Sequence, residues 1–108
     1  MLDELEFRSL VDVALQALFQ HLIECEEAAD AGFEVEEQGG VFSVIFEDAA
    51  DKFVITPNAA VRQIWISALS TSFKLDWDPA SGGFLLPRTG ESLIALVDRL
   101  IASHAPSN

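Results

Sequence analysis

The chain has 108 residues, of which 50% are hydrophobic, and its 18 Asp and Glu outnumber 6 Lys and Arg to give a formal net charge of −12. This length fits one domain with a modest core, and the hydrophobic share is too high for a disordered chain. The strong negative charge argues against nucleic acid and anionic membranes as partners, and it favours cations and basic protein surfaces.

The sequence shows no pattern of export or membrane insertion. Its N-terminus, M-L-D-E-L-E-F, is acidic rather than basic, and no apolar run is long enough to cross a bilayer. A single cysteine, Cys25, excludes an internal disulfide and a zinc site built from several cysteines. We therefore expect a cytoplasmic protein.

Residues 3–26 are predicted to form an amphipathic helix. Apolar residues recur there at spacings of three and four, namely Phe7, Leu10, Val11, Ala14, Leu18 and Leu22. Acidic residues occupy both ends of this segment. Those in the first turns are stabilised by the helix dipole, whereas Glu24, Glu26 and Glu27 crowd the end where the dipole disfavours negative charge. This second cluster opposes local stability, so we expect it to serve another purpose.

Between residues 33 and 87 the hydrophobic period changes to two, which predicts short β-strands. The expected strands cover residues 33–36, 41–47, 52–56, 61–68, 73–77 and 84–87. The turn signals Q-G-G and D-P-A-S-G-G separate two pairs of them. A second amphipathic helix is expected at about residues 90–102, capped by Thr89 or Ser92, and residues 103–108 are expected to form a frayed tail.

This order of elements predicts an α+β fold, a two-layer sandwich. Strands in an unbroken run pair mostly antiparallel, which gives a sheet of about five to six strands. The N- and C-terminal helices would both pack on one face of the sheet and leave the other face open to solvent. Residues 1–108 would form a single domain.

The familiar catalytic constellations are missing from the sequence. It contains no glycine-rich phosphate loop, no nucleophile elbow and no His-x-x-His pair. Its two histidines, His21 and His104, argue against a histidine-based metal site or a catalytic triad. Cys25 follows His21 by four residues on the predicted helix, and we interpret this pair as structural. We expect no catalytic residue and no enzyme.

Acidic residues concentrate between residues 24 and 37, where seven of fourteen are Asp or Glu. If the first helix packs beside the first strand, one edge of the molecule collects Glu24, Glu26, Glu27, Asp30, Glu34 and Glu36. Oxygen ligands of this kind attract hard cations weakly, and they also present a negative surface to a basic partner. A solvated face that only aids solubility is the alternative interpretation.

A tryptophan in the strand motif V-R-Q-I-W-I-S also points to function. Period two places Ile64 and Ile66 in the core, with Trp65 exposed on the opposite face beside Gln63. A register shifted by one residue would bury Trp65 but expose both isoleucines, which costs more. An outward Trp near Gln63, with Thr56 on the neighbouring strand, is typical of a protein-binding surface.

Several motifs resemble those of the frataxin family, in particular its short bacterial form. They are G-G-V-F-S-V-I-F-E (39–47), I-T-P-N-A-A-V-R-Q-I-W-I-S (55–67), F-K-L-D-W (73–77) and R-T-G-E-S-L (88–93). The resemblance extends over residues 6–101. It implies two helices on an antiparallel sheet, which agrees with the fold predicted above.

The resemblance implies a regulatory role in iron–sulfur cluster assembly, with at most a weak ferroxidase activity. Frataxins bind Fe²⁺ and Fe³⁺ weakly on an acidic ridge, where other divalent cations can substitute, and they modulate cluster synthesis. The implied partners are the cysteine desulfurase, the iron–sulfur scaffold protein and ferredoxin, and the default state is a monomer. Carried over to this sequence, the metal-binding ridge is Asp3, Glu4, Glu6, Asp12, Glu24, Glu26, Glu27, Asp30, Glu34 and Glu36. The partner-binding group is Trp65, Gln63, Thr56 and Asn58.

This chain departs from the family pattern in two places. Phe19 and Gln20 stand where bacterial frataxins often carry adjacent glutamates, which thins the ridge in its middle. The usual I-N-x-Q before the tryptophan strand is replaced by I-T-P-N, so Thr56 and Asn58 stand at the common Asn and Gln positions. The first departure weakens the case for strong iron loading, and the second changes two side chains at the scaffold contact.

Two other functions compete with this interpretation. Iron storage or ferroxidase-type detoxification by oligomers would need carboxylates that bridge two metals, and the sequence has no Glu-x-x-His motif. A nucleic-acid mimic would need acids spread over its whole surface, whereas here they cluster toward the start of the chain. The family resemblance favours the assembly regulator.

Overall fold

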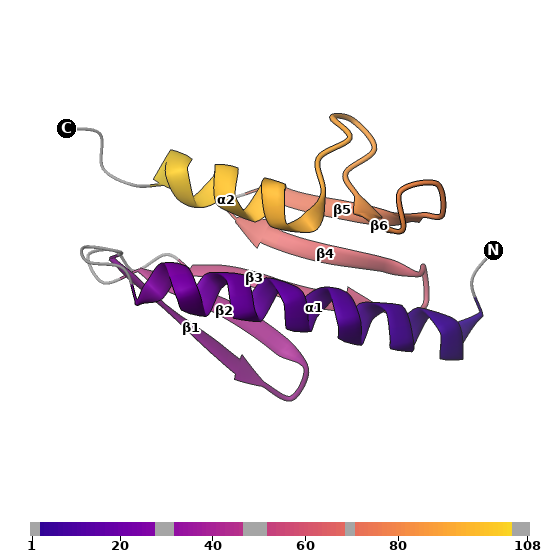
Figure 1. Ribbon diagram of the computed structural model, residues 1–108, viewed down its shortest axis with the longest axis horizontal. Helices are drawn as coiled ribbons and strands as arrows, with labels where there is room; N and C mark the ends of the chain where they lie inside the picture. The colour runs from indigo at the N-terminus through magenta and orange to yellow at the C-terminus, as the bar shows by residue number, and fades with distance from the viewer. Residues whose placement is uncertain (1–2, 28–31, 47–51, 69–70, 105–108) are drawn as a thin grey trace.

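The computed structural model describes residues 3–27, 32–46, 52–68 and 71–104. Its elements are α1 (Glu4–Glu26), β1 (Phe33–Gln38), β2 (Val41–Phe46), β3 (Lys52–Asn58), β4 (Gln63–Ala68), β5 (Thr71–Asp78), β6 (Gly83–Leu85) and α2 (Leu93–His104). The strands form one antiparallel sheet in chain order, and both helices lie on the same face of it, running in the same direction (Figure 1). The expected two-layer α+β sandwich is confirmed, with six strands.

Helix α1 begins at a capping residue. The Asp3 carboxylate accepts a hydrogen bond of 2.8 Å from the Glu6 backbone N–H, which satisfies one of the free donors of the first turn. The buried side of the helix consists of Phe7, Val11, Leu15, Leu18 and Leu22. The last turn contains no basic residue, so the glutamates at this end meet the dipole without local compensation.

Strand β4 shows the alternation that its sequence predicts. Ile64 and Ile66 are buried on the helix side, and Gln63 and Trp65 lie on the opposite side, which we call the outer face. The strand begins at residue 63 rather than 61 because Arg62 closes the preceding turn. Its backbone has a left-handed φ of 55°, and its N–H donates to the Ala59 carbonyl.

Proline is tolerated within β3 because of where the neighbouring strand ends. The register of β2 against β3 runs from the Ile45–Lys52 pair to the Phe42–Ile55 pair. Pro57 lies beyond it and is paired with β4 alone, opposite Ile64. A missing N–H donor therefore breaks no ladder bond to β2.

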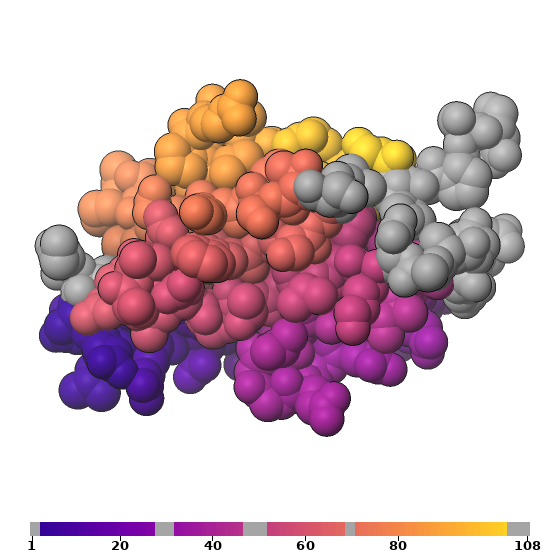
Figure 2. Space-filling view, turned by 180° about the vertical axis from the view of Figure 1, so that it is seen from behind, coloured from indigo at the N-terminus to yellow at the C-terminus, as the bar shows by residue number. Residues whose placement is uncertain are grey.

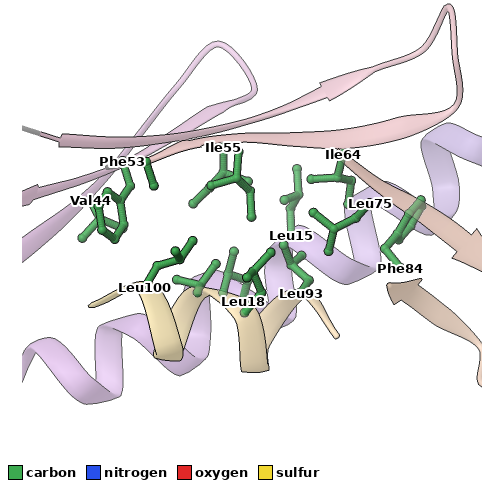
Figure 3. Close-up of a cluster of buried hydrophobic side chains, with 14 of the residues drawn as sticks. Leu15, Leu18, Val44, Phe53, Ile55, Ile64, Leu75, Phe84, Leu93 and Leu100 are labelled. Carbon is green, nitrogen blue, oxygen red and sulfur yellow. The ribbon is translucent and has the colours of Figure 1, made fainter. Parts of the chain in front are cut away.

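The core fills the space between the helices and the inner face of the sheet. Side chains from α1 and α2 meet those of β1 to β6 there, as the close-up in Figure 3 shows for Leu18, Leu100, Ile55 and Leu75. All four are essentially inaccessible to solvent, and no polar side chain is buried in the described part of the chain. Burial of this apolar layer is the main force that holds both helices on the sheet.

Helix α2 differs from the expected range at both ends. It begins at Leu93, because residues 86–90 form a turn in which the Gly90 N–H donates to the Leu86 carbonyl over 2.7 Å. Ser92, one of the two expected caps, accepts from the Ala95 N–H at 3.2 Å. Residues 103 and 104, which the sequence assigned to the tail, belong to the helix; residues 105–108 of the expected tail lie outside the described residues. Neither described helix is long and apolar enough to cross a membrane.

Candidate functional site

The outer face of the sheet is the first candidate surface. No helix covers it, and in the view of Figure 2 atoms of the strands fill its centre. Each strand contributes alternate residues to it, among them Glu34, Glu36, Ser43, Val54, Thr56, Asn58, Gln63, Trp65, Lys74 and Asp76. The surface is therefore mixed in character, with one aromatic ring in a polar surrounding.

Trp65 is fixed by its neighbours on this face. Its indole Nε1–H donates to the Gln63 Oε1 at 2.8 Å, and the Gln63 amide donates in turn to the Asp76 carboxylate at 2.9 Å. The Lys74 ammonium lies 4.9 Å from the ring centroid, within cation–π range. The ring is half-buried as a result, which corrects the expectation of an exposed indole, although its outward direction agrees with the sequence.

The four residues of the expected partner-binding group lie together. Thr56 is directly opposite Trp65 in the β3–β4 register, and Asn58 is directly opposite Gln63. Asn58 also accepts a hydrogen bond of 3.2 Å from the Ala60 N–H, so it shapes the turn that joins the two strands. All four are half-buried.

The acids at the start of α1 have local partners. Asp3 is the N-cap, and Glu4 forms a salt bridge of 2.5 Å with Arg8 one turn later. Glu6 and Asp12 are exposed. Since α1 has 23 residues, this end lies roughly 35 Å from the other end of the helix. The first-turn acids therefore do not share a cation with the acids at the end of α1.

The acids at the end of α1 are divided between its two sides. The Glu26 carboxylate accepts a hydrogen bond of 2.9 Å from the Val35 backbone N–H on β1. Residues two apart on a helix point in nearly opposite directions, so Glu24 lies on the side away from β1. Glu24 and Glu27 are exposed. Asp30, the remaining acid expected here, lies outside the described residues.

The acidic ridge is thus a broad negative surface. Glu34 and Glu36 are exposed on the outer face of β1, and Glu26 reaches that strand from the helix. Within the described residues, no three of the ridge carboxylates bring their oxygens together as a set of metal ligands. Separated carboxylates of this kind attract hard cations and basic surfaces through their summed field, with little selectivity.

A hollow of about 620 Å³ lies beside β5 and the turn before α2, and it shares Lys74 with the outer face. Its lining includes Lys74, Arg88 and Arg99. Arg99 is paired with Glu91 at 2.6 Å, and the hydrogen bond lowers the pKa of the Glu91 carboxyl below its usual value. None of the predicted site residues lines this hollow.

The structure also reveals a cluster that the sequence did not predict. The His21 Nε2 lies 2.8 Å from the Asp98 Oδ1 on α2 and 3.8 Å from the Cys25 Sγ. The spacing of four between His21 and Cys25 was visible in the sequence, but nothing in it indicated Asp98.

Phe19, a departure from the family pattern, packs its ring against Phe42 of β2 at a centroid distance of 5.4 Å.

Comparisons with known proteins agree with this architecture. A family model described as a frataxin-like domain matches residues 1–107. The iron–sulfur cluster assembly protein CyaY of Pseudomonas aeruginosa is 34% identical over 98 residues, which is 91% of this chain and 86% of that protein. The protein of the same name from Azotobacter vinelandii is 31% identical over 99 residues, covering 92% of this chain and 86% of the relative.

Two solved structures have a similar fold. Frataxin from Psychromonas ingrahamii superimposes with a TM-score of 0.74 at 21% identity, covering 96% of this chain and 92% of that one. Trimeric frataxin from the yeast Saccharomyces cerevisiae gives 0.67 at 27% identity, covering 86% and 79%. The family model, the relatives and the fold lead to one assignment: this chain belongs to the frataxin-like family.

Proposed function

We propose that this protein is a non-enzymatic accessory factor of iron–sulfur cluster assembly, which binds the cysteine desulfurase and the scaffold protein and modulates cluster synthesis. Membership of the frataxin-like family supports this role, as do relatives named as iron–sulfur cluster assembly proteins. The observation that carries the proposal is the uncovered outer face of the sheet, where Trp65 stands among polar side chains.

Trp65 is suited to bind a protein through its ring. The indole N–H is already bonded to Gln63, so the contact would bury the remaining apolar surface without leaving a donor unsatisfied. The hydrogen bonds from Trp65 to Gln63 and on to Asp76 fix the side chain before binding. A pre-organised aromatic ring at the centre of a patch is typical of binding hot spots.

The acidic surface would contribute attraction at longer range. Its carboxylates would steer the protein toward a basic surface of the desulfurase, and they would hold Fe²⁺ or Fe³⁺ weakly, with other divalent cations able to substitute. Interactions between exposed charges are screened over about 8 Å at physiological ionic strength. Affinity for the desulfurase should therefore fall steeply as salt is added.

The direct test is a pull-down from the native cell extract with wild type, Trp65→Ala and Ser67→Ala. Ser67 lies two residues from Trp65 on the same face, so its variant is the matched control. We expect Trp65→Ala to lose the desulfurase and the scaffold, and purified components to show an affinity at least about 30-fold lower. Equal recovery with all three proteins would contradict the proposal.

A second test separates docking from bulk charge. Glu24→Gln/Glu27→Gln and Glu4→Gln/Glu6→Gln change the net charge equally at opposite ends of α1. Glu26 is left intact because its carboxylate binds β1. We expect the first pair to weaken desulfurase binding more than the second. If both pairs weaken it equally, or if salt has no effect, the acidic end of α1 is not a docking surface.

Iron storage or detoxification by oligomers is the second candidate, because one structural relative at 27% identity is a trimeric frataxin. It predicts that iron converts the protein from a monomer to larger species, and that aerobic Fe²⁺ oxidation is faster with protein than without it. Size-exclusion chromatography during iron addition, together with an oxidation assay, measures both. A monomer with no acceleration would remove this candidate.

A further inference from the structure

The contact between the two helices holds three different metal-ligating side chains. His21 and Cys25 come from α1, and Asp98 comes from α2. The His21 Nε2 is 2.8 Å and 3.0 Å from the two Asp98 carboxylate oxygens, and 3.8 Å from the Cys25 Sγ. One ligand atom from each of the three residues lies within 4.8 Å of the other two. It is the only such group in the part of the chain that the structure describes.

The fold holds these side chains in place. His21 and Cys25 are four residues apart on one helix, so they project from the same side of α1, one turn above the other. Their neighbour Leu22 is completely buried. Val97 and Leu100, one residue before Asp98 and two residues after it, are buried in the same core. Because the core fixes both helices, the three ligands meet without an ordered loop or a second chain.

The arrangement does not fit a catalytic relay. In a triad, the histidine uses one ring nitrogen for the nucleophile and the other for the carboxylate. Here both Asp98 and Cys25 approach the same nitrogen, Nε2. Burial raises the pKa of the Cys25 thiol, and the carboxylates of Asp98 and Glu24 raise it further. The raised pKa makes the free thiol a poor nucleophile, and a cation would have to displace its proton. The convergence of three ligand atoms on one point is what suits a cation.

We propose that His21, Cys25 and Asp98 form a binding site for a borderline divalent cation of the zinc class, separate from the acidic ridge. Imidazole nitrogen, thiolate sulfur and carboxylate oxygen are the ligand types of protein zinc sites, and three protein ligands leave one position open. Tetrahedral ligands at about 2.0 to 2.3 Å from zinc lie roughly 3.3 to 3.7 Å from one another. The separations in this cluster require only small side-chain shifts to reach that geometry.

The surroundings favour a cation. The last turn of α1 contains no basic residue, and Glu24 is close enough to act on the Cys25 thiol. His21 and Asp98 have side-chain exposures of 33% and 46%, so an ion can enter from solvent. A bound cation would displace the thiol proton to solvent and replace the hydrogen bond between His21 and Asp98. It would also compensate the negative charge at this end of the helix.

The test is an anaerobic titration of the reduced, full-length protein with Co²⁺, a spectroscopic probe for zinc sites. We expect one equivalent to produce a sulfur-to-cobalt charge-transfer band and the visible bands of tetrahedral cobalt, and one equivalent of Zn²⁺ to abolish them. Cys25→Ser should remove the charge-transfer band. Asp98→Asn, which preserves side-chain shape on an exposed position, should weaken Co²⁺ binding at least about tenfold.

The control is Asp78→Asn at the end of β5, the same substitution at a carboxylate outside both the ridge and the cluster, which should bind Co²⁺ as wild type does. Circular dichroism on each variant confirms that the helices are intact. The proposal is overturned if wild type gives no charge-transfer band, if the band persists in Cys25→Ser, or if a folded Asp98→Asn binds as tightly as wild type. The readout needs no assembly partner, so it succeeds or fails independently of the pull-down with Trp65→Ala.

Discussion

The two tryptophans of this protein lie on opposite faces of the same sheet and have different surroundings. Trp77 on β5 is turned toward the helices, packs against the core and contacts the ring of the buried Phe84 at a centroid distance of 5.3 Å. Trp65 on β4 is turned outward, where Gln63 and Lys74 contact it. Both are only half-buried.

The difference shows that exposure alone does not reveal what an aromatic side chain does. Trp77 belongs to a chain of rings that continues through Phe84 to Phe7 on α1, so it links the last strands to the first helix. Trp65 has polar neighbours and lies on the face that no helix covers. We therefore expect Trp77 to serve stability and Trp65 to serve binding.

The largest difference in stability should come from replacing one isoleucine on each face of the sheet by alanine. Ile64→Ala removes a fully buried side chain and should lower the free energy of unfolding by about 2 to 5 kcal/mol. Ile45→Ala makes the same change on the outer face of β2, where the side chain is half-buried, and should cost no more than about 1 kcal/mol. Urea unfolding measures both. Equal losses would mean that the outer face is as important for folding as the core.

The two tryptophans allow the same substitution to be compared directly. Trp77→Ala should lower the free energy of unfolding by about 3 kcal/mol, near the lower end for buried aromatic rings. Trp65→Ala should lose no more than about 1.5 kcal/mol, mainly the hydrogen bond to Gln63. Thermal and chemical unfolding provide the values. A larger loss for Trp65 would assign it to the folded framework and weaken its assignment to partner binding.

Lys74 tests how firmly the outer tryptophan is held. Lys74→Met keeps most of the side-chain length but removes the ammonium above the indole ring, and it should cost about 0.5 to 1 kcal/mol. Lys52→Met makes the same change elsewhere on this face and is the control. If the two variants lose equal stability, the Lys74 charge contributes nothing specific to Trp65.

The smallest expected effect is a change in tryptophan fluorescence. The chain has two tryptophans and no tyrosine, so Trp77→Phe leaves Trp65 as the main emitter, and Trp65→Phe leaves Trp77. Addition of purified desulfurase and scaffold should change the emission of the Trp77→Phe variant and leave that of the Trp65→Phe variant unaltered. A change confined to the Trp65→Phe variant would place the interface near β5 and β6, not at β4.

The faces of the sheet could be predicted from sequence because a period of two is a local property. It assigned Ile64, Ile66 and Trp65 to their correct sides, and the family motifs supported the order of elements. The start of β4 was predicted two residues early. A left-handed backbone at Arg62 does not follow from its residue type, since a side chain other than glycine rarely adopts it.

The candidate site was predictable only where its parts are neighbours in sequence or in register. Thr56, Asn58, Gln63 and Trp65 lie on adjacent paired strands, so the hairpin brings them together. Asp98 lies 77 residues after His21, and only the packing of α2 beside α1 joins them. The ridge was expected as one surface from the family resemblance and the clustering of acids, but neither says on which side of a helix each carboxylate lies.

The hydrogen bond from Val35 to Glu26 has a consequence for the behaviour of this protein in a crowded solution. β1 is the first strand of the sheet, and its free backbone groups could otherwise template the addition of a strand from another molecule. Glu26 occupies one of these donors with a charged group, while Glu34 and Glu36 on the same strand would repel an identical copy. The acids along this border therefore oppose edge-to-edge aggregation, a benefit that does not depend on any metal or partner.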